Sequence, residues 1–267
     1  MQKIGVDTRI KAYDIMNEMR GKGLEENYII DKINKNFGLT TPTLKDWFSN
    51  RKSPYKRGIK YNKELFYVLG ALLGDGCIYQ WRNEHQIWLI GDYNFTSKYS
   101  SKISLCIGRK VKNYAKGKRN HWFVKISNIE LYNLFKEIRQ DYKKLLGLIL
   151  KGEIRENSLQ FIEGFFDAEG CVKIIKESVR KTPKICLDIT NVNYQLLEIV
   201  RNLIKENLQI EARYSIQKAD SVKNKQMTYH LRIYKKRDIK RFFDNISTTK
   251  LKPEKIIYVE NWLNNGK

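Results

Sequence analysis

The sequence is poor in the residues and segments that several classes of protein require. It has four cysteines and three histidines among 267 residues, with no Cys-x-x-Cys pair and no clustering of the two residue types, so neither a zinc site nor a disulfide framework is indicated. No apolar run approaches the roughly 18 residues of a membrane span, and the first residues lack the apolar core of a signal peptide. We therefore expect a soluble, intracellular protein from an archaeal or bacterial cytoplasm or from an organelle (mitochondrion or chloroplast), not a secreted or membrane protein.

Acidic residues are also scarce relative to basic ones. The chain has 51 lysines and arginines against 29 aspartates and glutamates, a formal net charge of +22. Such an excess favours a polyanionic partner, and nucleic acid is the leading candidate, with an anionic membrane surface as the competitor.

A short pattern occurs twice, as VLGALLGDG at 68–76 and IEGFFDAEG at 162–170. Each copy is an apolar run with small residues four positions apart, and it ends in an acidic residue followed at once by glycine. A strand-like run that starts with cysteine, Cys77 or Cys171, comes next; we expect both cysteines to be packed as small apolar side chains. The small residues are Gly70, Gly74, Gly164 and Ala168, and the acids are Asp75 and Glu169.

The position of the two acids suggests metal-assisted chemistry. Glycine just past a helix commonly adopts a positive φ, so Gly76 and Gly170 place the acids in the last helical turn. There the helix dipole disfavours a carboxylate by about 0.3–1 kcal/mol, unless a cation such as Mg²⁺ is bound. If the small residues let the two helices pack side by side, the acids meet at one point. The alternative interpretation is two buried helices with glycine caps and solvated acids. The occurrence of the same pattern in two copies argues against it.

Two longer stretches, YNKELFYVLGALLGDGCIY (61–79) and FIEGFFDAEGCVKI (161–174), resemble the signature of the LAGLIDADG homing endonucleases in their single-chain, two-motif form. The resemblance covers about residues 58–267. It departs from the family name at the sixth motif position, where Leu73 and Asp167 stand, whereas the acid at the eighth position is present in both copies. It implies an α+β fold of two pseudo-symmetric α-β-β-α-β-β-α units, 58–150 and 151–267, which form a DNA-binding saddle around the motif helices.

The order of predicted elements agrees with two fused copies of one unit. Each motif helix should be followed by strands, a helix, a hairpin and another helix, and a terminal helix should close the chain. The predicted strands are 86–91 and 184–191, the hairpins 105–127 and 211–235, and the helices 92–103, 128–138, 193–207 and 237–245.

Residues 1–57 are predicted to form a separate helical domain. Helices are expected at 8–20 and 26–36, and a third helix follows the N-cap Thr41, with Pro42 in its first position. This layout resembles helix-turn-helix domains of the resolvase and regulator type, in which the second helix of the motif enters the major groove. The alternative is a helical cap that binds nothing. The residues predicted to face DNA are Thr43, Lys45, Ser49 and Asn50.

The resemblance also implies roles for individual residues. Asp75 and Glu169 would be catalytic and would bind Mg²⁺, with backbone carbonyls from Gly74 and Ala168; Mn²⁺ would substitute, and Ca²⁺ would bind without cleavage. The family places a polar residue at the end of the second strand of each unit and a basic residue near the end of the fourth. These supporting positions correspond to Asn191 and Lys235 in the second unit, and to Asp92 (or Gly91) and Lys125 in the first.

DNA contacts are expected from the first strand and the hairpin of each unit. Alternate residues of a strand face the same way, so one set packs against helices and the other faces DNA. The first-strand candidates are Tyr79, Trp81 and Asn83 in the first unit and Lys173, Ile175 and Glu177 in the second. The hairpin candidates are Arg109, Lys112, Lys116, Lys118, Arg119, Arg213, Lys218, Lys223, Lys225 and Arg232.

These features predict a monomeric, site-specific and metal-dependent endonuclease that cleaves double-stranded DNA at a long asymmetric target and is encoded within an intron. One alternative is a maturase, which would bind intron RNA. Another is a DNA-binding regulator that does not cleave, although the retention of both acids argues against it.

Overall fold

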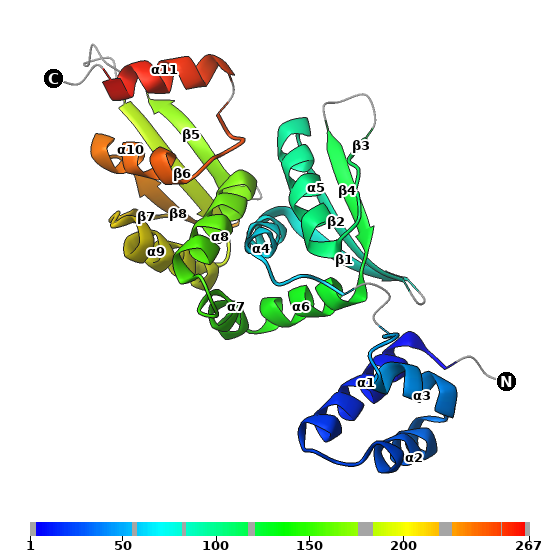
Figure 1. Ribbon diagram of the computed structural model, residues 1–267. Coiled ribbons are helices and arrows are strands. Elements are labelled where there is room, and N and C mark those ends of the chain that lie inside the picture. The colour runs from blue at the N-terminus through cyan, green and yellow to red at the C-terminus, as the bar shows by residue number, and fades with distance from the viewer. Residues whose placement is uncertain are drawn as a thin grey trace.

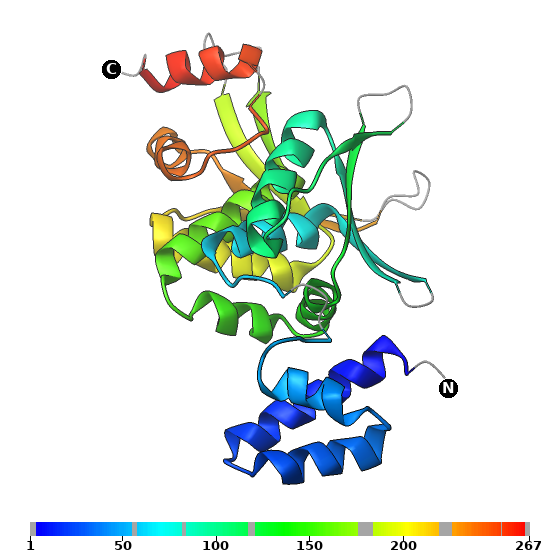
Figure 2. The ribbon, with the colours of Figure 1, turned by 45° about the vertical axis from the view of Figure 1, so that its right-hand side comes forward.

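The computed structural model describes residues 4–54, 58–81, 84–116, 121–175, 184–218, 226–251 and 253–264. Its hydrophobic side chains form two separate clusters, a small one in the N-terminal helices and a large one that spans the rest of the chain. The N-terminal helices lie apart from the larger body in both ribbon views (Figures 1 and 2). No described helix is both long and apolar enough to cross a membrane.

The N-terminal unit consists of three helices around a small core. Its most deeply buried side chains include Met16, Ile33, Leu44 and Trp47, one or more from each helix. The third helix begins one residue earlier than predicted, because Thr40 and not Thr41 is the N-cap. The helices are α1 Val6–Gly21, α2 Glu26–Phe37 and α3 Thr41–Phe48.

The first half of the larger body contains a four-stranded antiparallel sheet in the order β1-β2-β4-β3. In Figure 1, helices α4 and α5 lie along one side of this sheet. The elements are α4 Lys63–Asp75, β1 Gly76–Trp81, β2 Glu84–Gly91, α5 Tyr93–Ile107, β3 Tyr114–Ala115, β4 Trp122–Ser127, α6 Ile129–Gln140 and α7 Tyr142–Ile149.

The second half repeats this arrangement with a sheet in the order β5-β6-β8-β7. The strand register is the same, since Gly76 pairs with Leu89 in one sheet and Gly170 pairs with Ile189 in the other. The predicted α+β fold with two similar sheets is therefore confirmed. The elements are α8 Ile154–Glu169, β5 Gly170–Ile175, β6 Lys184–Asn191, α9 Tyr194–Leu208, β7 Arg213–Gln217, β8 Thr228–Ile233, α10 Lys236–Asn245 and α11 Pro253–Asn264.

Each sheet has one face packed into the large hydrophobic cluster and one open face. Ile87, Leu89 and Val124 are fully buried on the packed face of the first sheet. Tyr79 has the opposite parity and is 51% exposed, so this predicted first-strand residue lies on the open face. Cys77 and Cys171 are exposed as well, which corrects their assignment as packed side chains; all four cysteines are free thiols.

Helices α4 and α8 pack directly against each other through the small residues of the two motifs. A Cβ atom added to Gly70 would lie 2.3 Å from the Phe161 carbonyl oxygen, and one added to Gly164 would lie 2.0 Å from that of Tyr67. Because no real Cβ atom comes so close to backbone, only glycine permits this approach. The predicted side-by-side packing of the motif helices is confirmed.

The glycine after each acid has a different role from the one expected. Gly76 has φ −83° and Gly170 has φ −82°, so neither is a left-handed cap, and each helix passes directly into a strand. A Cβ atom on Gly76 would lie 2.5 Å from the Leu72 carbonyl oxygen, and one on Gly170 would lie 2.4 Å from that of Phe166. Glycine is needed here for close packing and not for a positive φ.

Candidate active site

The two acids of the repeated motif meet where α4 and α8 end. Asp75 is the last residue of α4, and Glu169 is the last residue of α8. Burial and the negative charge of Asp75 raise the pKa of Glu169 to about 7. Burial also raises the pKa of Asp75, although this side chain still reaches solvent. Two carboxylates that interact in this way form a site whose negative charge is not fully compensated.

Asn191 supports one acid and has no equivalent beside the other. Its amide Nδ2 donates a hydrogen bond of 2.8 Å to Glu169 Oε1 from the last position of β6. The matching last position of β2 is Gly91. Asp92, the other candidate for this role, instead caps α5 by accepting a 2.9 Å hydrogen bond from the Phe95 backbone amide. Asn191 thus lies against one of the acids, whereas Asp92 binds the first turn of α5.

Lys250 is a basic residue of the site that the sequence analysis missed. Its Nζ donates a 2.9 Å hydrogen bond to the Ala168 carbonyl oxygen. Its positive charge acts to lower the pKa of both acids, against the larger effect of burial. Of the two lysines predicted for a supporting role, Lys235 is the N-cap of α10, and the Lys125 ammonium lies 5.1 Å from the centroid of the Trp88 ring on the open face of the first sheet.

Asp167, the sixth residue of the second motif, holds the segment that carries Lys250. Its Oδ1 accepts 2.7 Å hydrogen bonds from the Thr248 hydroxyl and from the Thr249 backbone amide. Its Oδ2 accepts hydrogen bonds from the Tyr67 hydroxyl at 2.8 Å and from Lys98 Nζ at 2.9 Å. The side chain is completely buried. A buried carboxylate needs several donors, and two of those that Asp167 binds, on Thr248 and Thr249, precede Lys250 directly.

The donors at this site suit a hard divalent cation. They are carboxylate and carbonyl oxygens, which Mg²⁺ and Ca²⁺ prefer, and the raised pKa of Glu169 indicates charge that a cation would neutralise. Among the described residues no group of three or more histidine, cysteine, aspartate and glutamate side chains is close enough to hold a metal. The Ala168 carbonyl already accepts a hydrogen bond from Lys250. The carboxylates of Asp75 and Glu169 would therefore be the main ligands of a metal ion.

Several predicted DNA-contacting residues lie on the open faces of the sheets. Lys173 and Arg232 both form ion pairs with Asp188, and Arg213 lies opposite Arg232 on the neighbouring strand. Lys112 is exposed, whereas Arg109 donates a 3.3 Å hydrogen bond to the Ser127 carbonyl. The candidates outside the described residues are Asn83, Lys118, Arg119, Glu177, Lys223, Lys225 and the side chain of Trp81.

In the N-terminal unit the predicted contact residues are exposed or partly exposed, and three of them carry internal hydrogen bonds. Lys45 is exposed and Thr43 is partly exposed. The Ser49 hydroxyl donates to the Lys45 carbonyl at 2.8 Å. Asn50 has φ 57° and accepts a 3.4 Å hydrogen bond from Arg20. The Thr43 hydroxyl lies 2.9 Å from the Thr40 hydroxyl, within hydrogen-bond distance. Lys45 is thus the most accessible of the four side chains on this face of α3.

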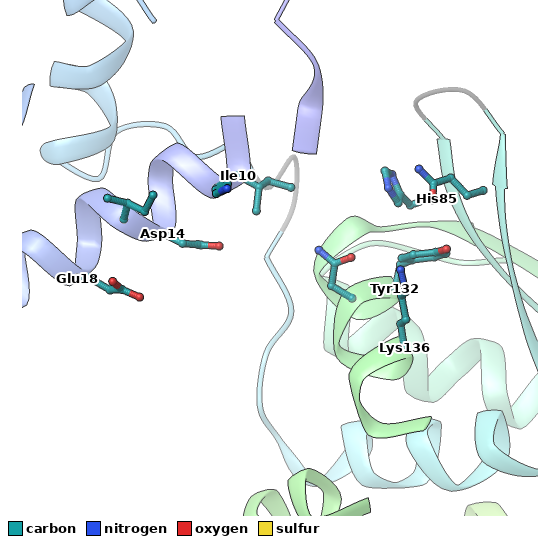
Figure 3. Close-up of a pocket in the computed structure, with 10 residues that line it drawn as sticks. Ile10, Asp14, Glu18, His85, Tyr132 and Lys136 are labelled. Atoms are coloured by element: carbon teal, nitrogen blue, oxygen red, sulfur yellow. The ribbon is translucent and has the colours of Figure 1, made fainter. Parts of the chain in front are cut away.

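A pocket of about 470 Å³ lies between the N-terminal unit and the first sheet (Figure 3). Ile10, Asp14 and Glu18 of α1 line one side, and Tyr132 and Lys136 of α6 line the other. Neither Asp75 nor Glu169 lines it, so this pocket belongs to the junction between the two units and not to the acidic site.

Comparison with known proteins identifies the fold. Residues 156–247 match the family model of a LAGLIDADG-like domain. A structure of mesophilic variants of the homing endonuclease I-DmoI is 21% identical, with 73% of this chain and 98% of that chain covered and a TM-score of 0.51. The complex of I-DmoI with DNA and Ca is 23% identical, with 75% and 98% covered and a TM-score of 0.50. No curated protein matches the sequence. The second half thus matches a LAGLIDADG-like domain, and the larger body has a fold like that of the homing endonuclease I-DmoI.

Proposed function

We propose that the protein is a divalent-metal-dependent endonuclease that cuts both strands of a long asymmetric DNA target. The observation that carries this proposal is the meeting of Asp75 and Glu169 at the ends of α4 and α8, where burial and the charge of Asp75 raise the pKa of Glu169 to about 7. The net charge of +22 adds support, as does the I-DmoI complex, in which a protein of this fold is bound to DNA with Ca.

The chain's own residues would prepare a phosphodiester for hydrolysis. Asp75 and Glu169 would hold Mg²⁺ or Mn²⁺, which neutralises charge on the attacking and leaving oxygens. Asn191 fixes the orientation of Glu169 through its 2.8 Å hydrogen bond. Lys250 brings a positive charge close to both acids, where it would stabilise the additional negative charge that develops on the scissile phosphate.

The open faces of the two sheets would lie along the DNA, one on each side of the acids. A monomer is sufficient, because a single chain supplies both acids and both sheets. If the gene lies in an intron, the uninterrupted copy of the host gene supplies the candidate target sequence.

Replacing either acid tests the proposal. Asp75→Asn and Glu169→Gln should each reduce plasmid cleavage by at least about a thousandfold, because charge neutralisation at the phosphate is lost. Both variants should still bind the target in Ca²⁺, which a mobility-shift assay measures. If Asp75→Asn cleaves DNA at the wild-type rate, the two acids do not take part in catalysis and the proposal is wrong.

The N-terminal unit is proposed to read additional bases through α3. Removal of residues 1–57 should shorten the footprint at one end and weaken binding, while cleavage is retained because both acids lie in the remaining chain. Lys45→Ala combined with Thr43→Ala should reproduce the shorter footprint in the full chain. Lys22→Ala, a change of an exposed residue after α1, is the matched control. An unchanged footprint in the double variant would identify the unit as a structural cap.

A further inference from the structure

The open face of the first sheet is dominated by aromatic side chains. Trp88 on β2 is paired with Lys125 on β4, and Ile90 is paired with Phe123. The Trp88 and Phe123 rings are stacked with centroids 5.6 Å apart, and the Tyr114 ring lies 5.6 Å from that of Phe123. We call Trp88, Phe123 and Tyr114 the aromatic strip.

The polar atoms of this region are mostly used within the sheet. Trp88 Nε1 donates a 3.1 Å hydrogen bond to Gln86 Oε1, and Gln86 Nε2 donates to Glu84. The Lys125 ammonium lies over the Trp88 ring, 5.1 Å from its centroid. Apart from the phenol of Tyr114, the strip therefore offers a bound molecule an apolar surface.

The open face of the second sheet is ionic where the first is aromatic. Asp188 stands at the position of Trp88, since the two pair with Cys171 and Cys77 respectively. Burial alone would raise the pKa of Asp188, but hydrogen bonds from Lys173 and His230 outweigh burial and hold this pKa below its usual value. Asp188 is thus an anion, and it is completely buried.

This buried anion orients Arg232. The Arg232 Nε lies 3.3 Å from Asp188 Oδ1, and the arginine side chain is 30% exposed. A guanidinium held at Nε keeps its terminal nitrogens in a fixed fork. Arg213 lies directly opposite on β7 and is exposed. The second sheet therefore presents oriented hydrogen-bond donors on Arg232 and Arg213. The carboxylate of Asp188 is buried, so a DNA base cannot reach it.

We propose that the two sheets read halves of the target that differ in base chemistry, with thymines against the aromatic strip and guanines against Arg232 and Arg213. This inference rests on the proposed function. In the major groove the thymine methyl is the apolar group of the base pairs, and guanine presents the paired acceptors O6 and N7 that arginine binds. Guanine or cytosine placed against the Phe123 ring of the strip would lose water without gaining a partner there.

Selection of bound duplexes from a randomised DNA pool in Ca²⁺ is the first test. The enriched sequences should carry a run of thymines in one half and guanines in the other. Specific binding with the same base preference in both halves would overturn the inference while the proposed function stands. Failure to enrich any duplex sequence would count against both, and tighter binding to a single-stranded pool would show that the strip stacks on unpaired bases instead.

Uracil substitution of the selected site is the sharper test, since it removes only the methyl group and leaves the protein unchanged. Each thymine against the aromatic strip should lose about fourfold in affinity when replaced by uracil, as expected for one buried methyl. The same replacement in the other half is the control and should have no effect. Equal affinity for the thymine and uracil forms of the first half would overturn the inference.

Two variants assign the effect to residues. In Trp88→Ala, uracil substitution of the first half should no longer weaken binding, whereas in Arg232→Gln it still should. Replacing guanine in the second half by 7-deazaguanine, which lacks the N7 acceptor, should weaken binding by the wild type and by Trp88→Ala but not by Arg232→Gln. The opposite pattern would overturn the assignment of the halves.

Discussion

The two halves of the larger body have the same backbone plan but different side chains around their acids. Strand order and register agree between the sheets. Glu169 nevertheless has Asn191 as a hydrogen-bond donor, where the first half has Gly91. Asp167 of the second motif binds four donors, whereas the equivalent Leu73 packs against the hydrophobic core.

This comparison distinguishes the residues that the fold requires in both halves from the residues that surround the acids. The small residues of α4 and α8 are needed on both sides, because two helix backbones can approach only if both lack bulk at the contact. The groups around each acid differ between the halves, since Asn191 and Asp167 of the second half correspond to Gly91 and Leu73 of the first. The protein therefore has a symmetric scaffold with an asymmetric site.

The largest effect is expected where the two halves must be alike. Gly164→Ala would place a Cβ 2.0 Å from the Tyr67 carbonyl oxygen and should lower the free energy of unfolding by about 3 kcal/mol or more. Gly147→Ala is the matched control, since no atom lies within 4 Å of the added Cβ in α7. It should stabilise the protein by about 0.5–1 kcal/mol. Thermal unfolding measures both, and equal stability of the two variants would contradict the packing argument.

A smaller effect, confined to activity, is expected at Lys250. Lys250→Met should slow cleavage by about a hundredfold or more, because a positive charge beside both acids is lost. Because Lys250 donates its hydrogen bond to the Ala168 carbonyl, next to Glu169, the two strands should be affected unequally and nicked plasmid should accumulate. Lys235→Met, at the exposed N-cap of α10, should cleave normally. Equal slowing of both strands would show that Lys250 serves the two halves alike.

The smallest effect concerns stability as a function of pH. The pKa of Glu169 is raised to about 7 in the folded protein, so its contribution to stability is complete below its unfolded pKa and is lost as the pH rises through 7. Glu169→Gln should therefore melt a few degrees above the wild type at pH 8, and the difference should disappear near pH 5. Glu206→Gln, exposed on α9, is the control. Mg²⁺ should raise the melting temperature of the wild type at pH 8 and not that of Glu169→Gln.

Much of the fold could be predicted because its signals are local and periodic. The strands 86–91 and 184–191 and the helices that follow them agree with β2, α5, β6 and α9. The errors arose where a residue type has two uses. Glycine after a helix was interpreted as a left-handed cap, but at Gly76 and Gly170 the close approach of the preceding turn requires it. Cys77 and Cys171 are small enough to be buried or exposed, and the strand parity exposes them.

The acids of the site could be predicted and most of its supporting residues could not. Asp75, Glu169 and Asn191 belong to a motif or to a strand end that the sequence marks. Lys250 is one of 51 basic residues. Its position depends on hydrogen bonds from Thr248 and Thr249 to Asp167, which lies more than 80 positions earlier in the chain. Pairings over such separations leave no periodic trace in the sequence.

The sequence by itself determined the paired helices, the two acids at their ends and the basic character of the chain, because spacing and composition are properties of the chain alone. Only the tertiary structure decided which lysine approaches the acids and which strand faces remain open. It also placed an aromatic strip on one sheet and a buried aspartate with its arginine on the other. The physical reason is that these features depend on contacts between segments far apart in the chain, which form only when the two halves pack around α4 and α8.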